Sequence, residues 1–100
     1  MIRVDPAENE IRLLFELAQL DGMRVLEVGA GDGRLTWRFA ATAAQVTAVE
    51  PYAPAVQRAR RNMPAGLKGK LRLVQAGFQE YAARQKRGAF ERILFSWALC

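Results

Sequence analysis

The stretch that decides the fold is Val25-Leu26-Glu27-Val28-Gly29-Ala30-Gly31-Asp32-Gly33, a short apolar segment that runs into three glycines at alternate positions. The glycines predict a tight turn in which bare backbone lies beside a ligand, because glycine lacks a Cβ. The turn opens a helix whose unpaired N–H groups face the same crevice. Glu50 ends the next apolar stretch, where a carboxylate can accept hydrogen bonds from the two hydroxyls of a ribose. Together these features indicate a site for a nucleoside-containing cofactor.

The spacing of the glycines narrows the class of cofactor. A dinucleotide fingerprint, G-x-G-x-x-G, requires glycine at position 34, but this chain has Arg34. The spacing therefore disfavours a nicotinamide-dependent oxidoreductase, which remains an alternative because it would use Glu50 in the same way.

The pattern E-x-G-x-G-x-G, formed by Glu27, Gly29, Gly31 and Gly33, resembles the first motif of class I S-adenosylmethionine-dependent methyltransferases. Three later stretches resemble that family's following motifs in the same order, at residues 46–50, 73–78 and 89–99. The resemblance covers nearly the whole chain. It implies an α/β fold, a Rossmann-like parallel sheet with helices on both faces and strand order 3-2-1-4, truncated after the fourth strand.

The alternation of helical and strand patterns independently predicts a parallel sheet with helices on both faces, in one domain spanning residues 1–100. The expected helices are 5–20, 34–44, a third that begins at Pro54, and 79–85; the expected strands are 23–28, 45–50, 71–75 and 90–97. We expect these helices to turn apolar side chains inward, namely Ile11, Leu14, Phe15 and Ala18, then Leu35, Phe39 and Ala43, then Val56, Ala59 and Met63, then Tyr81 and Ala82.

The resemblance also implies which residues bind the cofactor. Gly29, Ala30 and Gly31 would pass beneath its methionine and ribose portions, and Glu50 would accept from the ribose. The remaining expected contacts are Glu27 toward the methionyl amino end, Pro51, Tyr52, Gly77 and Phe78 around the adenine, and Ser96 at the end of the fourth strand.

Several of these residues also have a structural alternative. Glu27 could cap the N–H groups of the turn, since a buried carboxylate without a partner is costly. Tyr52 could belong to the core, and Ser96 could simply end a strand. Glu91 replaces the family's more usual aspartate before the fourth strand, where the residue is structural, and Trp37 and Trp97 are expected to pack rather than bind substrate.

The composition of the chain bears on metal sites, disulfides, membrane spans and cellular location. The chain has 51% hydrophobic residues, no histidine and one cysteine, Cys100, so we expect neither a metal site nor an internal disulfide. It contains no apolar stretch of about 18 residues that would span a membrane. Its first residues lack a signal-peptide core, which predicts a cytosolic location.

The expected activity is transfer of a methyl group from the sulfonium of S-adenosylmethionine to a nucleophilic acceptor, with a non-catalytic cofactor-binding fragment as the alternative. A small-molecule acceptor is favoured. The net charge of +5 permits a nucleic-acid partner, but no aromatic residues alternate with the basic ones to stack on bases.

The fourth strand would form an exposed apolar edge of the sheet. Three explanations are open: the chain is a fragment of a longer protein, a homodimer covers the edge, or the domain is a minimal one. We favour the fragment.

Overall fold

The computed structural model describes residues 16–96. Four strands, β1 (Arg24–Val28), β2 (Gln45–Val49), β3 (Leu71–Val74) and β4 (Arg92–Phe95), form one sheet in the order β3-β2-β1-β4. All three strand pairings are parallel. The predicted α/β fold and the strand order 3-2-1-4 are therefore confirmed.

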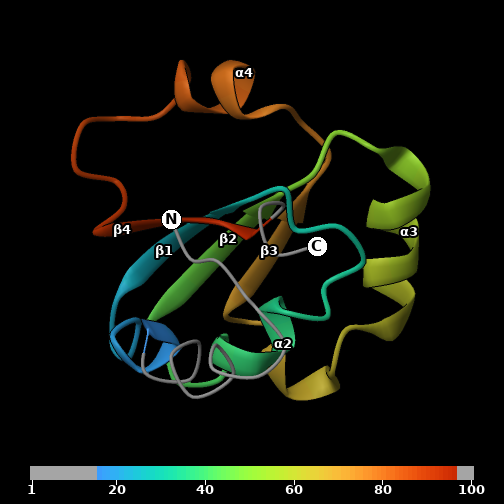
Figure 1. Cartoon of the computed structure of the whole chain (residues 1–100), viewed down its shortest axis with the longest axis horizontal. Coiled ribbons are helices and arrows are strands. Elements are labelled where there is room, and N and C mark those ends of the chain that lie inside the picture. The colour runs from blue at the N-terminus through green and yellow to red at the C-terminus, as the bar shows by residue number, and fades with distance from the viewer. Residues whose placement is uncertain (1–15, 97–100) are drawn as a thin grey trace, which may run out of the picture.

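Helices cover both faces of this sheet. They are α2 (Thr36–Phe39), α3 (Ala53–Asn62), the 3₁₀ turn η1 (Ala65–Leu67) and α4 (Phe78–Ala82). Figure 1 shows α4 on one side of the sheet and α2 on the other, with α3 beside β3. This arrangement explains why the strands are apolar on both faces, as is usual for a parallel sheet.

The core divides into two clusters because neighbouring strand residues point to opposite faces. Val25 and Val46 pack with Phe39 of α2 in the larger cluster. Leu26 and Val49 belong to the smaller cluster, against which Phe78 of α4 packs. The helices thus hold the strands from both sides and fix the positions of the strand ends.

The second helix is shorter than the sequence predicts. A helix was expected over 34–44, but α2 covers only Thr36–Phe39. After it, the Thr42 hydroxyl donates to the carbonyl of Phe39, and the N–H of Ala44 bonds the carbonyl of Met23 near β1. These bonds compete with a continued helix and turn the chain toward β2. Phe39 and Ala43 are nevertheless buried, as expected, and Leu35 is half-buried.

Two expected inward side chains point to solvent. Ala18 and Ala82 are both exposed, so these predictions were wrong. Near the first, the larger Leu17 and Leu20 are buried instead. Near the second, Phe78 packs against the core, and so does the half-buried Tyr81, as predicted. Bulky side chains bury more apolar area than alanine and so decide how each helix is rotated.

The observed strands and the start of α3 agree with their predictions within one or two residues, whereas α4 ends at Ala82, three residues before the expected end, and most of the helix expected over 5–20 lies outside the described residues. In α3, Val56 and Ala59 are buried, and Met63, directly after the helix, packs against the larger cluster, as expected. The expectations for Ile11, Leu14 and Phe15, and for Trp97 and Cys100, lie outside the described residues.

β4 is an edge strand of the sheet formed by the described residues. Ile93 on this strand is 50% exposed, so an apolar side chain does lie at this edge. Pairing of the edge with a second copy stays a prediction, as does a cytosolic location. None of the helices in the described part of the chain is long and apolar enough to cross a membrane.

Candidate cofactor-binding site

The site begins with the glycine turn that follows β1. Gly29, Gly31 and Gly33 all have positive φ, at 76°, 59° and 91°. L-amino acids with a Cβ rarely adopt this region, which explains why glycine occupies all three positions. The N–H groups of Gly29 and Ala30 both donate to the carbonyl of Val49, at 3.0 and 3.2 Å. The turn is therefore fixed against the end of β2.

The second and third glycines differ in what surrounds them. A Cβ on Gly31 would have no heavy atom within 4 Å, so the space above this residue is open. A Cβ on Gly33 would overlap the indole ring of Trp37, which lies directly over it. Gly31 thus leaves room for a ligand, whereas Gly33 leaves room for a side chain of the protein.

Glu50 follows β2 and closes the other side of the turn. Its Oε1 accepts a hydrogen bond of 2.8 Å from the N–H of Gly31, and its Oε2 accepts one of 3.0 Å from the N–H of Tyr52. The carboxylate is only partly buried. Each oxygen has a second lone pair, so the group can still accept from two hydroxyls.

Glu27 is the fully buried acid of the site, with no exposed surface. The Thr36 hydroxyl donates to its Oε1, while Oε2 has no hydrogen-bond partner among the described residues. Burial raises the pKa of Glu27 from 4.5 to about 7, and the hydroxyls of Thr36 and Ser96 counteract part of this rise. Its alternative role as a cap for the turn is not observed, because the partner is Thr36 rather than a backbone N–H of the turn.

Ser96 joins the end of the fourth strand to the turn. Its hydroxyl donates to the carbonyls of Val28 and Gly29, at 3.3 and 3.1 Å, and the residue is 5% exposed. Glu91, at the other end of this strand, accepts from the N–H of Arg24 at 3.0 Å and pairs with the Arg24 guanidinium. Glu91 is therefore structural, as expected.

The expected adenine-side residues lie at the same edge of the sheet. The N–H of Ala76 donates to the carbonyl of Glu50, which places the segment before Gly77 beside the acid. Phe78 packs edge-on against Phe95, with ring centroids 5.5 Å apart. Tyr52 is 65% exposed and Pro51 is exposed as well. Tyr52 is thus a surface residue and not part of the core.

These features fit a cofactor that carries an ammonium group and a ribose. Oε2 of Glu27 is an orphaned buried acceptor, the open space over Gly31 is a cradle that a Cβ would fill, and Glu50 is a partly exposed carboxylate beside that cradle. An unpaired buried carboxylate costs free energy that a bound cation would offset. Within residues 16–96, no three histidine, cysteine or acidic side chains gather as metal ligands would.

Sequence reasoning missed Thr36 as the partner of Glu27 and left open what Trp37 packs against. The spacing of Glu27 and Thr36, one on a strand and the other nine residues later on a helix, gives no periodic signal. An indication for Trp37 was available, because a glycine four residues before a tryptophan at a helix start suits ring-over-backbone packing.

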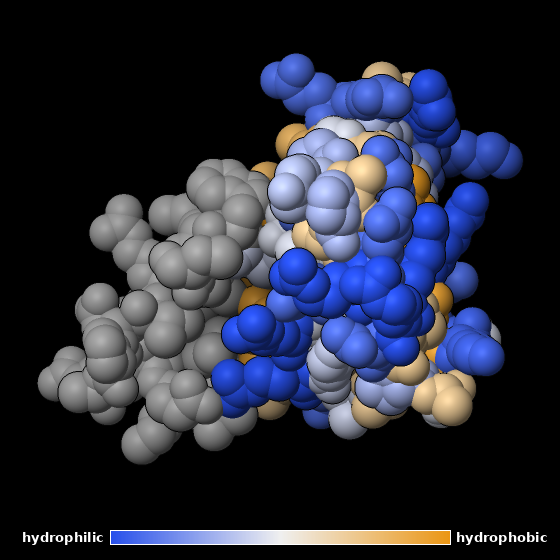
Figure 2. Space-filling view, turned by 90° about the vertical axis from the view of Figure 1, so that its right-hand side faces the viewer, coloured by the Kyte–Doolittle hydropathy of each residue, from blue (hydrophilic) through white to orange (hydrophobic). Residues whose placement is uncertain are grey.

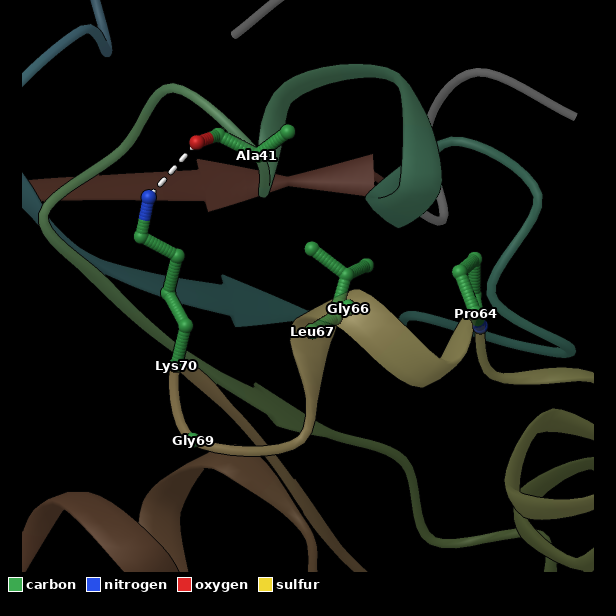
Figure 3. A pocket seen from close by; sticks show the side chains of 6 residues that line it. All are labelled: Ala41, Pro64, Gly66, Leu67, Gly69 and Lys70. Carbon is green, nitrogen blue, oxygen red and sulfur yellow. Dashed lines mark hydrogen bonds between the residues drawn. The ribbon is translucent and has the colours of Figure 1, made fainter.

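A separate pocket of about 460 Å³ lies away from this site (Figure 3). Its lining residues precede β2 and β3, whereas the glycine turn and Glu50 follow β1 and β2; they are Ala41, Pro64, Gly66, Leu67, Gly69 and Lys70. The Lys70 ammonium donates to the carbonyl of Ala41 at 2.5 Å. The one charged group of the pocket is therefore already engaged by the protein.

Comparison with solved structures shows that this fold is shared. The chain is similar to a SAM-dependent methyltransferase from Agrobacterium tumefaciens, with a TM-score of 0.70 and 23% identity over 86% of this chain and 30% of that one. It is similar to an RNA methyltransferase from Salinibacter ruber, solved with S-adenosyl-L-homocysteine, with a TM-score of 0.63 and 24% identity over 90% and 58%. It is also similar to the C-terminal domain of precorrin-6Y C5,15-methyltransferase from Rhodobacter capsulatus, with a TM-score of 0.64 and 19% identity over 85% and 48%.

The chain spans less than two thirds of the length of each of these three structures. No curated protein matches it significantly. A family model described as a methyltransferase domain matches residues 25–100, which include β1 from its second residue, the glycine turn, Glu50 and the other three strands. The resemblance drawn from the four motifs is thus confirmed, and the chain belongs to the methyltransferase-domain family.

Proposed function

We propose that this chain binds S-adenosylmethionine at the edge of the sheet formed by the glycine turn and Glu50, as the cofactor-binding part of a methyltransferase. One observation carries the proposal: the N–H of Gly31 bonds Oε1 of Glu50 at 2.8 Å, so the open cradle and the ribose acceptor lie side by side. Membership of the methyltransferase-domain family supports the same cofactor.

Different residues of the chain would bind different parts of the cofactor. Glu50 would accept from the ribose hydroxyls and Oε2 of Glu27 would face the methionyl ammonium. The remaining proposed contacts are the backbone of Gly29, Ala30 and Gly31 beneath the methionine and ribose, Pro51, Tyr52, Gly77 and Phe78 around the adenine, and Ser96 through its hold on the turn. The burial of Glu27 supports its assignment, because desolvation raises the pKa of the carboxyl and a bound ammonium would stabilise its charged form.

When bound, the cofactor supplies a methyl group that is already activated on a sulfonium. The residues of this chain therefore need only bind and orient, and positioning alone can lower a barrier by about 7–11 kcal/mol. Glu27 would hold the methionyl ammonium and Glu50 the ribose, and the glycine turn is fixed by the bonds from Gly29 and Ala30 to Val49. We assign no general base, because only an acceptor that must lose a proton requires one.

Two acceptor classes follow from different features. A small-molecule acceptor is favoured by the absence of aromatic residues among the basic ones, which would otherwise stack on bases. Nucleic acid is favoured by one observation, the gathering of basic side chains on α3 and β3 that is argued below. The Salinibacter ruber structure, an RNA methyltransferase, is compatible with the second class.

We also propose that residues 1–100 are part of one cofactor-binding domain, supported by the single sheet and the two clusters on its faces. The exposed Ile93 at the edge strand β4 supports the view that further strands or a second copy complete the sheet. A parent reading frame that stops after residue 100 would count against further strands in the same chain.

The test is calorimetric titration of the purified chain with S-adenosylmethionine, S-adenosylhomocysteine and NAD. Saturable binding of the first two but not of NAD is expected. Failure of a chain that circular dichroism shows to be folded would refute the proposed site, and binding of NAD alone would revive the oxidoreductase alternative. A methyl-transfer assay with labelled cofactor then separates an enzyme from a non-catalytic binding fragment.

A further inference from the structure

The positive charge of this protein is concentrated in one segment. Residues 51–79 contain six basic side chains and no acidic one. The rest of the chain contains nine basic and ten acidic side chains, so it is close to neutral. The whole excess of positive charge therefore comes from the segment that forms α3, η1 and β3.

The fold exposes most of this charge on adjoining elements. We call Arg58, Arg60, Arg61, Lys68 and Arg72 the α3–β3 basic surface; all five are exposed. Arg58, Arg60 and Arg61 lie on α3, Lys68 directly follows η1, and Arg72 lies on the edge strand β3. Arg60 reaches across from α3 to the carbonyl of Leu73 on β3, at 3.4 Å. Figure 2 shows the side of the molecule on which α3 lies, and strongly hydrophilic side chains spread across it.

No acidic group in the described part of the chain neutralises this surface. Ion pairs within residues 16–96 join Arg24 to Glu91, Arg34 to Asp32, and Arg84 to Glu80, and none includes a member of the basic surface. A solvated helix face more often carries charges of both signs, which support each other at spacings of three and four residues. Here Arg58 and Arg61 are like charges three residues apart, an arrangement that costs stability.

Helix electrostatics explain only part of the pattern. Arg60 and Arg61 lie in the last turn of α3, where positive charge favourably meets the helix dipole. Arg58 lies before that turn, and Lys68 and Arg72 lie outside the helix. Interaction with the helix dipole therefore does not account for Arg58, Lys68 and Arg72.

We propose that the α3–β3 basic surface binds the sugar-phosphate backbone of a nucleic acid, without reading its sequence. Clustered arginines contact phosphate oxygens well, because the guanidinium donates two parallel hydrogen bonds. The surface offers no aromatic ring for base stacking, so binding rests on phosphate contacts. A membrane surface is disfavoured, because only two large apolar residues among those described are exposed: Ile93 lies on β4, at the edge of the sheet opposite β3, and Tyr52 lies at the start of α3, six residues before Arg58.

The position of the surface relates it to the cofactor site. α3 begins three residues after Glu50, and Arg58 lies about 8 Å further along the helix axis than Ala53, at 1.5 Å per residue. A nucleic-acid strand bound along α3 would therefore extend toward the glycine turn. The binding itself does not depend on the proposed methyl transfer, and it would fit a nucleic-acid acceptor if that transfer holds.

The test measures binding of a fluorescein-labelled, mixed-sequence single-stranded RNA of 20 nucleotides by anisotropy, at several salt concentrations. The variant Arg58→Gln/Arg61→Gln/Lys68→Gln removes three charges from the surface. The matched control, Arg84→Gln/Lys86→Gln/Arg87→Gln, removes three exposed charges elsewhere and leaves the same net charge. A second variant, Arg58→Lys/Arg61→Lys, retains the charge. S-adenosylhomocysteine binding is titrated in parallel for each protein.

We expect the surface variant to lose at least tenfold in affinity at low salt, and the slope of log affinity against log salt to fall by about 2 for three lost contacts. The control and the lysine variant should stay within threefold of the original protein. Equal losses in both triple variants would show attraction by net charge alone and overturn the proposal, as would absence of RNA binding, or binding of phosphatidylserine vesicles in its place. Unchanged S-adenosylhomocysteine binding in all variants keeps this result separate from the proposed function.

Discussion

The backbone N–H of Gly31 donates a hydrogen bond of 2.8 Å to Oε1 of Glu50, 19 residues later in the chain. The bond joins the turn after β1 to the end of β2, the two places where parallel strands of an open sheet present ligand-binding groups. The carboxylate holds the turn in place, and we propose a second role in which its remaining lone pairs accept from a ribose.

Replacing this acid tests both roles. We expect Glu50→Ala to weaken S-adenosylhomocysteine binding at least tenfold, because hydrogen bonds to a charged group contribute on the order of 1.5–3 kcal/mol each. The fold should survive, since the side chain is only partly buried. Calorimetry measures the affinity and circular dichroism checks the fold. Glu80→Ala, which removes one exposed acid from α4, is the control, and unchanged affinity of a folded Glu50→Ala protein would remove Glu50 from the site.

Gly31→Ala tests the cradle. The new Cβ would meet no protein atom within 4 Å, so the stability cost comes only from a positive φ of 59°. The same methyl group would project into the space where we expect the cofactor. The expected result is loss of S-adenosylhomocysteine binding by at least tenfold in a protein about as stable as Gly88→Ala, which has a φ of +81° and open surroundings. Full binding by Gly31→Ala would show that the cofactor lies elsewhere.

Gly33→Ala tests a packing requirement instead. Its Cβ would overlap the Trp37 ring, in addition to the strain of a φ of 91°. We expect this variant to unfold more easily than Gly88→Ala by about 1–3 kcal/mol, the usual cost of overpacking. Urea denaturation compares the two. The double variant Gly33→Ala/Trp37→Leu should recover part of the difference, and if Gly33→Ala and Gly88→Ala prove equally stable, the ring does not restrict this position.

Glu27 predicts a dependence of stability on pH. Its pKa is about 7 in the folded chain against 4.5 for an exposed glutamate, so between these pH values the folded state binds more protons than the unfolded state. The contribution of Glu27 to the free energy of unfolding is therefore greatest below about pH 4.5. It falls as the pH rises to about 7 and is then constant, with a total change of roughly 3 kcal/mol. Glu27→Gln cannot titrate, so its stability relative to the original protein should rise across the same range. Urea unfolding between pH 4.5 and 8 measures this difference, and parallel curves for the two proteins would contradict it.

The order of the elements and the cofactor edge of the sheet could be predicted because their signals are local. Short, mainly apolar runs such as 25–28 and 46–49, separated by helical patterns, are typical of strands in a parallel sheet, and glycines at alternate positions permit a turn that other residues do not. Because the strands of such a sheet are parallel, their carboxyl ends lie at one edge, so Gly31 and Glu50 are expected to lie near one another. Ser96 was expected at this edge for the same reason.

Only the tertiary structure decided which side chains meet across the fold. The partner of Glu27 is Thr36, and the ring that requires Gly33 to lack a side chain is that of Trp37. Neither contact follows a period of two or 3.6 residues, because each joins a strand or turn to a helix whose rotation is set by bulkier neighbours. The same competition for burial left Ala18 and Ala82 exposed.

The sequence by itself thus determined the alternation of helices and strands, the glycine turn and the position of Glu50 after the second strand, because backbone conformation and apolar periodicity are local properties; the strand order came from the resemblance to the methyltransferase family. The sequence also shows that residues 51–79 carry an excess of positive charge, but it does not show where those charges lie on the folded molecule. Packing of α3 beside β3 placed most of those charges at exposed positions on adjoining elements, where no acidic side chain among residues 16–96 forms an ion pair with them. Electrostatic and packing interactions depend on distances between segments, and those distances exist only in the folded molecule.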